Sequence, residues 1–294
     1  ERRMTRPMEP MARRETDLWF TEYQTPDMRL GLKIDEILLN TQTAYQHLLV
    51  VKTEQYGNLL ALDGAIMITE KDEFTYHEMM SHIAMCAHPS PKRVLVVGGG
   101  DGGIVRELVR HEALEKVTLV DIDEEVIQAS RRFFPSVSCA LDHPKVEVRP
   151  MDALVYIKDH KDEFDVIIVD STDPVDFAAG LFEEAFFRDV HMALHEDGMV
   201  VSQTESPMGH PEILGTAYRE MKKVFPVVEL CWGIMPTYPT GSWTYTLASK
   251  RYDPKNPVRR PPEGTKYYSP QIHRACFVLP PFLEKILAEG RETA

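Results

Sequence analysis

The chain has 294 residues, 43% of them hydrophobic, which is enough for one large domain or a large domain with a smaller one. Its net charge of −13 argues against nucleic acid as a partner and suits cationic ligands, although acidity is also common among cytosolic proteins. No apolar run reaches the roughly 20 residues of a membrane span. The four scattered cysteines are expected to be buried, reduced thiols of a cytoplasmic protein.

The first segments of the chain predict a lead and a small β-domain. Residues 1–17 are basic without an apolar core, so they do not resemble a secretory signal, and we expect a disordered lead. Over residues 18–70, polar and apolar residues alternate, and turns are expected at Gly57–Asn58 and Asp63–Gly64. This pattern predicts several short antiparallel strands.

Residues 71–294 are predicted to form the main domain, beginning with a helix. Thr69 and Asp72 fit a capping box that would start this helix, which would end near His88. Buried strands then alternate with helices, and this alternation predicts an α/β fold with a mostly parallel, doubly wound sheet and helices on both faces. Strands are expected at 93–97, 117–123, 145–150, 164–170 and 198–203, with helices at 102–111, 124–134, 152–160, 183–194 and 211–225.

The last part of the domain departs from this alternation. Two long strands, at 227–235 and 242–250, are expected to form an antiparallel edge of the sheet. Residues 251–270 are rich in proline and are expected to be irregular.

Acidic residues follow the carboxyl ends of the predicted strands, which is where open α/β sheets bind their ligands. Because the strands lie side by side in such a sheet, these residues predict a ring of carboxylates around one crevice. The strand ends carry Asp101, Asp121, Asp123, Asp152, Asp170, Asp173, Gln203 and Glu205.

Three of these acids have two interpretations each. Asp121 lies about 20 residues past the glycine loop, where an acid binds the ribose of a nucleoside, and we rank this above helix capping. For Asp123 capping ranks higher, because a predicted helix follows at once. Asp152 suits a helix cap and a contact with an adenine edge equally.

The glycine loop is VVGGGDGG, residues 96–103, in which Gly98, Gly100 and Gly103 match the nucleotide-binding pattern G-x-G-x-x-G. This pattern alone is weak, but Asp101 narrows its meaning. A carboxylate about 4 Å from a pyrophosphate would oppose it by about 4 kcal/mol at an effective dielectric constant of about 20. The loop contains no Arg or Lys that would compensate. It therefore favours a nucleoside with a neutral or cationic tail, such as a sulfonium nucleoside.

The segment DSTD, residues 170–173, places two carboxylates three residues apart after a buried strand. A turn is the simplest interpretation, because Pro174 follows. Paired acids at this position can also bind an ammonium group and remove its proton. An alkyl ammonium such as that of Lys has a pKa of about 10.4, and only the deprotonated amine is a nucleophile. Asp170 or Asp173 could therefore activate an amine.

Aromatic and histidine side chains complete the predicted site. Tyr76 and His77 could orient the amine nitrogen from the first predicted helix. His77 and His82 are five residues apart and do not share a helix face, so no metal site is predicted. A slot for an aliphatic diamine could be walled by four aromatic residues, each of which taken singly is more often part of a core: Trp19, Tyr76, Tyr238 and Trp243.

Several segments, in order, resemble the polyamine aminopropyltransferases, the family that includes the spermidine synthases. The resemblance starts near residue 18 and continues to the C-terminus. It rests on LWFTEYQT, YQHL, LDGAIMITEKDEFTYHEM, VLVVGGGDGG, VDIDEEVI, DVIIVDSTDP, PTYPTGSWTYTLAS and KYYSPQIHRACFVLP. It implies transfer of the aminopropyl group of decarboxylated S-adenosylmethionine to putrescine, with spermidine and methylthioadenosine as products.

The resemblance also implies an architecture and partners. It implies a small N-terminal β-domain ahead of a Rossmann-like, methyltransferase-type domain, in a homodimer or homotetramer. The donor is a co-substrate, and no cofactor or metal is implied. Neither nucleic acid nor a membrane is an expected partner.

The resemblance assigns roles to individual residues. Asp170 would be the catalytic base, Asp101 would bind the donor's aminopropyl ammonium, and Asp173 would bind the acceptor amine. Other amine-side residues would be Tyr76, His77, Gln203 and Tyr238. Nucleoside contacts would come from Gln46, Gly98, Gly100, Asp121, Asp152 and Ala153. Asp101 is then explained, because the decarboxylated donor carries only positive charge on its tail.

Two departures from the family pattern concern the loop near the adenine and the choice of acceptor. Asp176–Phe177 replaces a usual Gly-Pro, and Ala153 stands where Gly is common. Met67 offers an apolar wall that does not separate putrescine from agmatine or a longer amine. The alternatives are an aminopropyltransferase for another amine, an S-adenosylmethionine-dependent methyltransferase, an NAD-dependent dehydrogenase, and a non-catalytic polyamine-binding protein.

Overall fold

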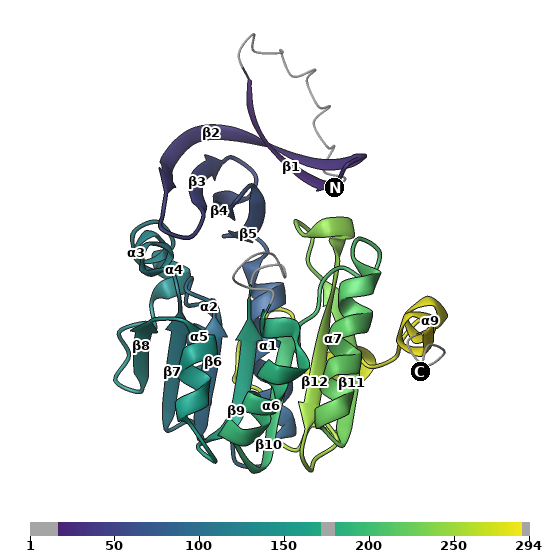
Figure 1. The fold of residues 1–294 in the computed structure, drawn as a ribbon. Coiled ribbons are helices and arrows are strands. Elements are labelled where there is room, and N and C mark those ends of the chain that lie inside the picture. The colour runs from purple at the N-terminus through teal and green to yellow at the C-terminus, as the bar shows by residue number, and fades with distance from the viewer. Residues whose placement is uncertain (1–16, 172–179, 290–294) are drawn as a thin grey trace, which may run out of the picture.

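The computed structural model describes residues 17–171 and 180–289 (Figure 1). A five-stranded sheet at the N-terminus lies across one end of a seven-stranded sheet, which carries helices on both faces. The predicted α/β fold with a small antiparallel β-sheet ahead of it is confirmed.

The small sheet is an antiparallel meander in which each strand pairs with the next along the chain. Asp63 and Gly64, with φ of 48° and 87°, make the tight turn between its last two strands. One strand has fifteen residues, longer than the short strands predicted, and it stays paired through two register shifts. The strands are β1 Leu18–Thr25, β2 Met28–Gln42, β3 His47–Thr53, β4 Gly57–Leu62 and β5 Ala65–Thr69.

The large sheet has the order β11-β12-β10-β9-β6-β7-β8. The five strands from β10 to β8 run parallel, and β12 is antiparallel to both of its neighbours. The predicted antiparallel edge is therefore confirmed. The strands are β6 Arg93–Gly98, β7 Lys116–Asp121, β8 Val146–Pro150, β9 Phe164–Asp170, β10 Leu194–Gln203, β11 Val227–Ile234 and β12 Ser242–Ser249.

Helices cover the large sheet on two faces and build two separate cores. Met79 and Ile83 pack on one face with Val96, and Phe187 packs on the other with Ile167. The first face is covered by α1 Glu73–Ala87, α2 Gly103–Leu108 and α8 Pro270–Ala275. The second is covered by α5 Ala153–Tyr156, the 3₁₀ turn η1 Ile157–Asp159, α6 Glu184–Ala193, α7 Pro211–Val224 and α9 Pro281–Glu289.

The small sheet is fixed to the large domain through a third core. Leu48, Leu60 and Ile68 of the small sheet pack against Val126 and Ala129. The last two belong to α3 Glu124–Phe133, which is followed by α4 Pro135–Ser138. This packing places the small sheet over the carboxyl ends of β6 and β7.

The start of α1 differs from the prediction. Asp72 occupies the N-cap position, but its side chain does not cap the helix. One carboxylate oxygen accepts from the Thr69 hydroxyl at 2.5 Å, and the other accepts from the backbone and the hydroxyl of Thr237 at 3.1 and 2.9 Å. The predicted capping box is wrong because this carboxylate binds Thr69 and the distant Thr237 instead of a backbone N–H of the helix start.

Three further expectations can be compared with the structure. Cys139 is exposed at the end of the short helix α4, so the expectation of four buried thiols is wrong for this residue. Residues 251–269 contain no helix or strand, as predicted. None of the helices described is long and apolar enough to cross a membrane.

Candidate functional site

A cavity of about 150 Å³ lies between the carboxyl ends of the parallel strands and the small sheet. The cavity thus lies at the edge of the large sheet where the strand-end rule predicts a ligand site. The residues that the family resemblance assigned to catalysis or to substrates, as far as the structure describes them, line this cavity: Gln46, Tyr76, His77, Gly98, Gly100, Asp101, Asp121, Asp152, Ala153, Asp170, Gln203 and Tyr238. Asp123 and Glu205, predicted for the same ring of carboxylates, are buried but are not part of the cavity wall.

At two positions of the loop after β6, neighbouring atoms lie so close to the backbone that only glycine fits. Gly98 has φ +78°, and a Cβ there would overlap the backbone carbonyl of Asp170. A Cβ on Gly103 would overlap the imidazole of His77. The glycine pattern thus lets the end of β9 and the His77 ring approach the loop backbone.

Asp121 and Asp123, both just after β7, have different surroundings. Asp121 accepts hydrogen bonds from the backbone N–H groups of Gly100 and Asp123, at 2.8 and 2.9 Å, and burial raises its pKa to about 6. Asp123 caps α3 through the N–H of Glu125, at 3.1 Å, which confirms the capping prediction. Its second oxygen accepts from the Gln46 amide at 3.0 Å, and this bond holds Gln46 at the cavity wall.

For Asp152, the structure confirms the helix cap, and the adenine contact stays a prediction. It caps α5 by accepting from the backbone N–H of Leu154 at 2.8 Å. Its side chain also belongs to the cavity wall, beside Ala153 at the first position of the helix.

Asp170, the last residue of β9, faces the cavity next to Tyr76. The Tyr76 hydroxyl donates a hydrogen bond to one of its oxygens. Burial, and then the negative charge of Asp101, raise the pKa of Asp170 to about 7, while the Tyr76 hydrogen bond and the charge of His77 act in the opposite direction. The result is a carboxyl group that can hold or release a proton near neutral pH.

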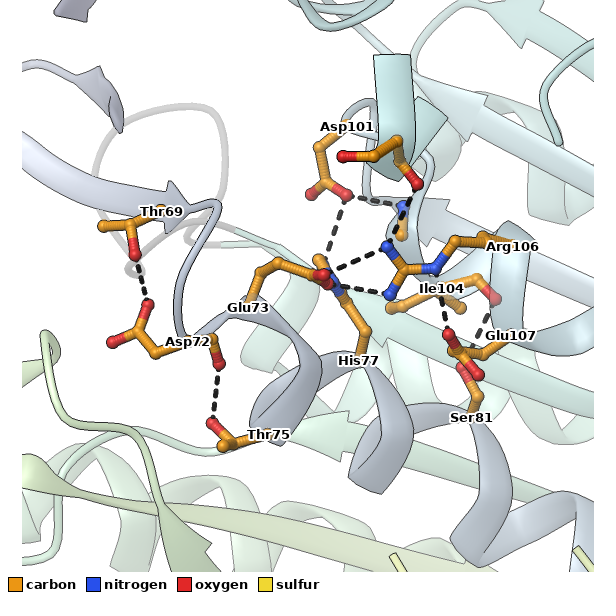
Figure 2. A network of polar contacts seen from close by, with 12 residues as sticks. Thr69, Asp72, Glu73, Thr75, His77, Ser81, Asp101, Ile104, Arg106 and Glu107 are labelled. Carbon is orange, nitrogen blue, oxygen red and sulfur yellow. Dashed lines mark hydrogen bonds and ion pairs between the residues drawn. The ribbon is translucent and has the colours of Figure 1, made fainter. Parts of the chain in front are cut away.

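Asp101 is held by the backbone and by His77 (Figure 2). Its Oδ1 accepts from the backbone N–H of Gly103 at 2.6 Å and lies 3.2 Å from His77 Nε2. His77 Nδ1 lies 2.5 Å from Glu73 Oε2. Burial lowers the pKa of His77, but the two carboxylates outweigh burial and raise it to about 10.

Aromatic rings form a further part of the cavity wall. The Tyr238 hydroxyl donates to the backbone oxygen of Met67 at 2.6 Å, and the rings of Tyr238 and Trp243 meet edge-on with centroids 4.6 Å apart. Gln203 donates its amide to the carbonyl of Ser171 at 3.0 Å. Trp19 is 57% exposed and lies outside the cavity wall, so its predicted place in the aromatic slot is wrong.

The sequence matches two known protein families. Residues 73–258 match the family model of the spermine/spermidine synthase domain, and residues 18–70 match that of the spermidine synthase tetramerisation domain. The chain belongs to the polyamine aminopropyltransferase family. Its members are alkyl-group transferases of polyamine biosynthesis, so the protein is an enzyme of that class.

Relatives match this aminopropyltransferase over nearly their whole length. The polyamine aminopropyltransferase of Caldicellulosiruptor saccharolyticus is 46% identical over 277 residues, which cover 93% of this chain and 99% of the relative. That of Shouchella clausii is 47% identical over 273 residues, which cover 92% and 99%.

Solved structures share the fold. The crystal structure of spermidine synthase from Thermotoga maritima is 40% identical with a TM-score of 0.89, over 98% of this chain and 100% of that one. A spermidine synthase in complex with the transition-state analogue AdoDATO is 40% identical with a TM-score of 0.90, over 95% and 99%.

Several residues in or behind the cavity wall were not predicted from the sequence. Glu22 of β1 is buried and lines the cavity, and its signal was an acid two residues after Phe20 on the inward face of a strand. Glu73 and Arg106 stand behind His77, and the spacing of Glu73 four residues before His77 on a helix was the available signal. Asp173 and Asp176–Phe177 lie outside the described residues.

One group of side chains approaches the composition of a metal site, at the opposite edge of the large sheet. It consists of His88, Asp165 and Asp197. The backbone N–H of Ser90 donates to His88 Nδ1 at 3.1 Å, so the ring proton is on Nε2, which faces the two carboxylates. A protonated Nε2 does not coordinate a metal, and we assign no metal to this group.

Proposed function

We propose that this aminopropyltransferase transfers the aminopropyl group of decarboxylated S-adenosylmethionine to putrescine, forming spermidine and methylthioadenosine. The charge of the cavity wall carries this proposal. Among the described lining residues there is no Lys or Arg, and five side chains are carboxyl groups: Glu22, Asp101, Asp121, Asp152 and Asp170. A sulfonium donor with an ammonium tail and a diammonium acceptor complement this wall. The AdoDATO complex of a related spermidine synthase supports the same substrates.

The donor is assigned to the glycine-loop side of the cavity. Asp101 would bind the aminopropyl ammonium through the oxygen that neither Gly103 nor His77 contacts. Asp121 would bind the ribose hydroxyls, because it lies at the end of β7 beside the glycine loop. The adenine would lie near Asp152 and Ala153, with Gln46, Gly98 and Gly100 as further contacts.

The acceptor is assigned to the aromatic side. Met67, Tyr238 and Trp243 give an apolar wall for a short alkyl chain, and Glu22 provides a carboxylate for the ammonium group at its far end. Asp173 is proposed as a second ligand of the reacting amine, and Gln203 as a residue that orients the acceptor side.

Asp170 is the proposed general base. Its pKa of about 7 lies closer to that of an alkyl ammonium than the usual aspartate value of 3.8, which makes proton transfer less uphill. Once the acceptor ammonium has given a proton to Asp170, the free amine attacks the carbon next to sulfur. The C–N bond forms as the C–S bond breaks, and the electron pair of that bond leaves with sulfur as a neutral thioether. Holding both substrates in line lowers the entropic part of the barrier.

The reaction transfers no electrons between substrates and its leaving group is neutral, so we propose that it needs no cofactor or metal. We also propose that the chain forms a homodimer or a homotetramer. The match of residues 18–70 to a tetramerisation-domain model supports an oligomer, and the exposed apolar residues of β1, Leu18, Trp19 and Tyr23, give it a contact surface.

A mass-spectrometric assay tests the proposed function. Purified protein is mixed with decarboxylated S-adenosylmethionine and, separately, putrescine, agmatine, cadaverine or spermidine, each with and without EDTA. We expect methylthioadenosine together with spermidine from putrescine, at an unchanged rate in EDTA. Preference for another amine would change the acceptor, and loss of activity in EDTA would contradict the metal-free reaction.

The same assay separates the rival functions. S-adenosylmethionine replaces the decarboxylated donor in a parallel set of reactions. Methyl transfer from it, without aminopropyl transfer from the decarboxylated form, would favour a methyltransferase. Binding of putrescine with no product from any donor would favour a polyamine-binding protein.

A further inference from the structure

A buried row of alternating charges leads from the cavity wall into the contact between α1 and α2 (Figure 2). It begins at Asp101, continues through His77 and Glu73, and reaches Arg106 and Glu107. The side chains of His77 and Glu73 are only 1% and 6% exposed. Asp101 and His77 line the cavity, but Glu73, Arg106 and Glu107 do not, so any effect of these three on the site must act through His77.

The His77 ring is fixed from several sides. Its two nitrogens lie 2.5 Å from Glu73 and 3.2 Å from Asp101, and Gly103 leaves room for the ring because it has no Cβ. Arg106 donates hydrogen bonds to both carboxylate oxygens of Glu73, at 3.0 and 2.9 Å, and one to the carbonyl of Ser136 at 3.3 Å. Glu73 is therefore not free to turn away from the imidazole.

Only the charged form of His77 matches this arrangement. A neutral imidazole has one N–H, whereas an imidazolium has two: Nδ1–H is within hydrogen-bond distance of Glu73, and Nε2–H forms an ion pair with Asp101 at 3.2 Å, outside hydrogen-bond geometry. We propose that Glu73 and Arg106 are positioning residues, which hold His77 as a cation so that one oxygen of Asp101 stays free for the donor's ammonium and the Asp170 carboxylate has a positive neighbour.

The second part of this inference rests on the proposed function of Asp170 as base. The charged groups around His77 are Glu73 on its own helix, Asp101 on the glycine loop, Asp170 at the end of β9 and Arg106 on α2. Asp101 opposes ionisation of Asp170, and His77 partly cancels that repulsion. Loss of the His77 charge would leave the base protonated to a higher pH.

Two variants separate this role from simple burial. E73Q removes the carboxylate that faces His77. E107Q is the matched control, because Glu107 is also buried and binds the same Arg106, but it does not contact His77. The ring nitrogens of His77 are followed by ¹⁵N NMR between about pH 6 and pH 9 in the protein without substrates, with the signal assigned by its absence in H77Q. The pH profile of kcat/KM is measured on the same proteins.

We expect the wild-type His77 ring to stay doubly protonated across this range and to lose a proton within it in E73Q. The acidic limb of the pH profile should move up by about one pH unit in E73Q and stay in place in E107Q. A wild-type His77 that titrates near pH 6.5, an ordinary value for histidine, would overturn the inference without any variant. An equal shift in E73Q and E107Q would also overturn it. If His77 behaves as expected in a protein without aminopropyl transfer, the result supports the charged His77 and overturns the proposed function.

Discussion

At the scale of single residues, three aspartates of the cavity differ in their hydrogen-bond partners and therefore in the roles proposed for them. Asp101 is bound by a backbone N–H and faces His77, Asp121 is bound by two backbone N–H groups, and Asp170 is bound by a tyrosine hydroxyl. Burial raises the pKa of Asp121 to about 6 and that of Asp170 to about 7. Asp170 is therefore the group of this set best suited to accept a proton near neutral pH.

The first prediction concerns this base. D170N should lower kcat by about 10²–10⁴-fold, the usual contribution of a general base, because the amide cannot accept the amine's proton. Donor affinity, measured by calorimetry without acceptor, should change little, since the donor's ammonium is assigned to Asp101. The control is D152N, at the adenine side of the cavity, which should alter donor affinity more than turnover. Near wild-type turnover of D170N would show that another group is the base.

The second prediction follows from the same pKa as a stability effect. Between about pH 4 and pH 7 the unfolded chain has released the Asp170 proton while the folded protein keeps it, so the free energy of unfolding falls as pH rises. D170N lacks this titration. It should therefore gain stability relative to the wild type through this range, by about 4 kcal/mol at most, with a constant difference above pH 7.

Thermal melts of both proteins without substrates, at about pH 5 and about pH 8, measure this difference. D165N is a suitable control, because Asp165 accepts backbone hydrogen bonds at the opposite edge of the sheet. A stability difference between D170N and wild type that shrinks as pH rises would contradict a raised pKa.

At the scale of elements, Asp72 links the start of α1 to the loop between β11 and β12. That loop contains the 3₁₀ turn η3 Pro239–Gly241 and carries Tyr238, whose hydroxyl reaches back to Met67 just before the end of β5. Asp72 accepts two hydrogen bonds from Thr237, the neighbour of Tyr238. The two contacts hold the aromatic wall in place relative to the small sheet.

The third prediction tests this link. D72N should reduce the free energy of unfolding by about 1.5–3 kcal/mol, because hydrogen bonds to a charged acceptor are lost in a buried place. The KM for the amine acceptor should rise, while the dissociation constant of the donor should not. D63N is the matched control, because it removes the charge from a carboxylate that accepts a hydrogen bond from the backbone N–H of His47 at the exposed β4–β5 turn. Equal effects of D72N on donor and acceptor would contradict a specific link to the acceptor wall.

The elements also show what the sequence could and could not predict. Strand positions and the carboxylates at strand ends followed from local periodicity and one topological rule, so Asp101, Asp121 and Asp170 were found together. Contacts such as Asp72 with Thr237 join side chains 165 residues apart, and no local pattern encodes them. Trp19 was misplaced for a related reason, because period-two alternation defines two faces of a strand without saying which one meets the cavity.

At the scale of the whole molecule, the cavity depends on a fixed position of the small sheet relative to the large one. Glu22 and Gln46 reach it from the small sheet, and the carboxylates of the strand ends reach it from the large one. The apolar contact of the small sheet with α3 fixes this arrangement within one chain. The outer face of the small sheet, in contrast, leaves large apolar side chains in contact with solvent, including Trp19 at 57%, Tyr23 at 71% and Ile37 at 51% exposure.

The fourth prediction is that this outer face joins chains into the proposed dimer or tetramer. Trp19 and Tyr23 are four residues apart on β1 and therefore point to the same side of the sheet. W19E should place a charge in the interface and lower the molar mass in solution, measured by light scattering at several concentrations, since burying an unpaired charge costs several kcal/mol. V258E is the control, because Val258 is equally exposed, at 61%, and lies in the irregular segment of the large domain. If W19E and the double variant W19E/Y23E keep the wild-type mass with unchanged circular dichroism, the chains associate through another surface. If only the W19E variants dissociate and turnover falls together with the molar mass, the small sheet needs contacts with a second chain to keep its position over the cavity.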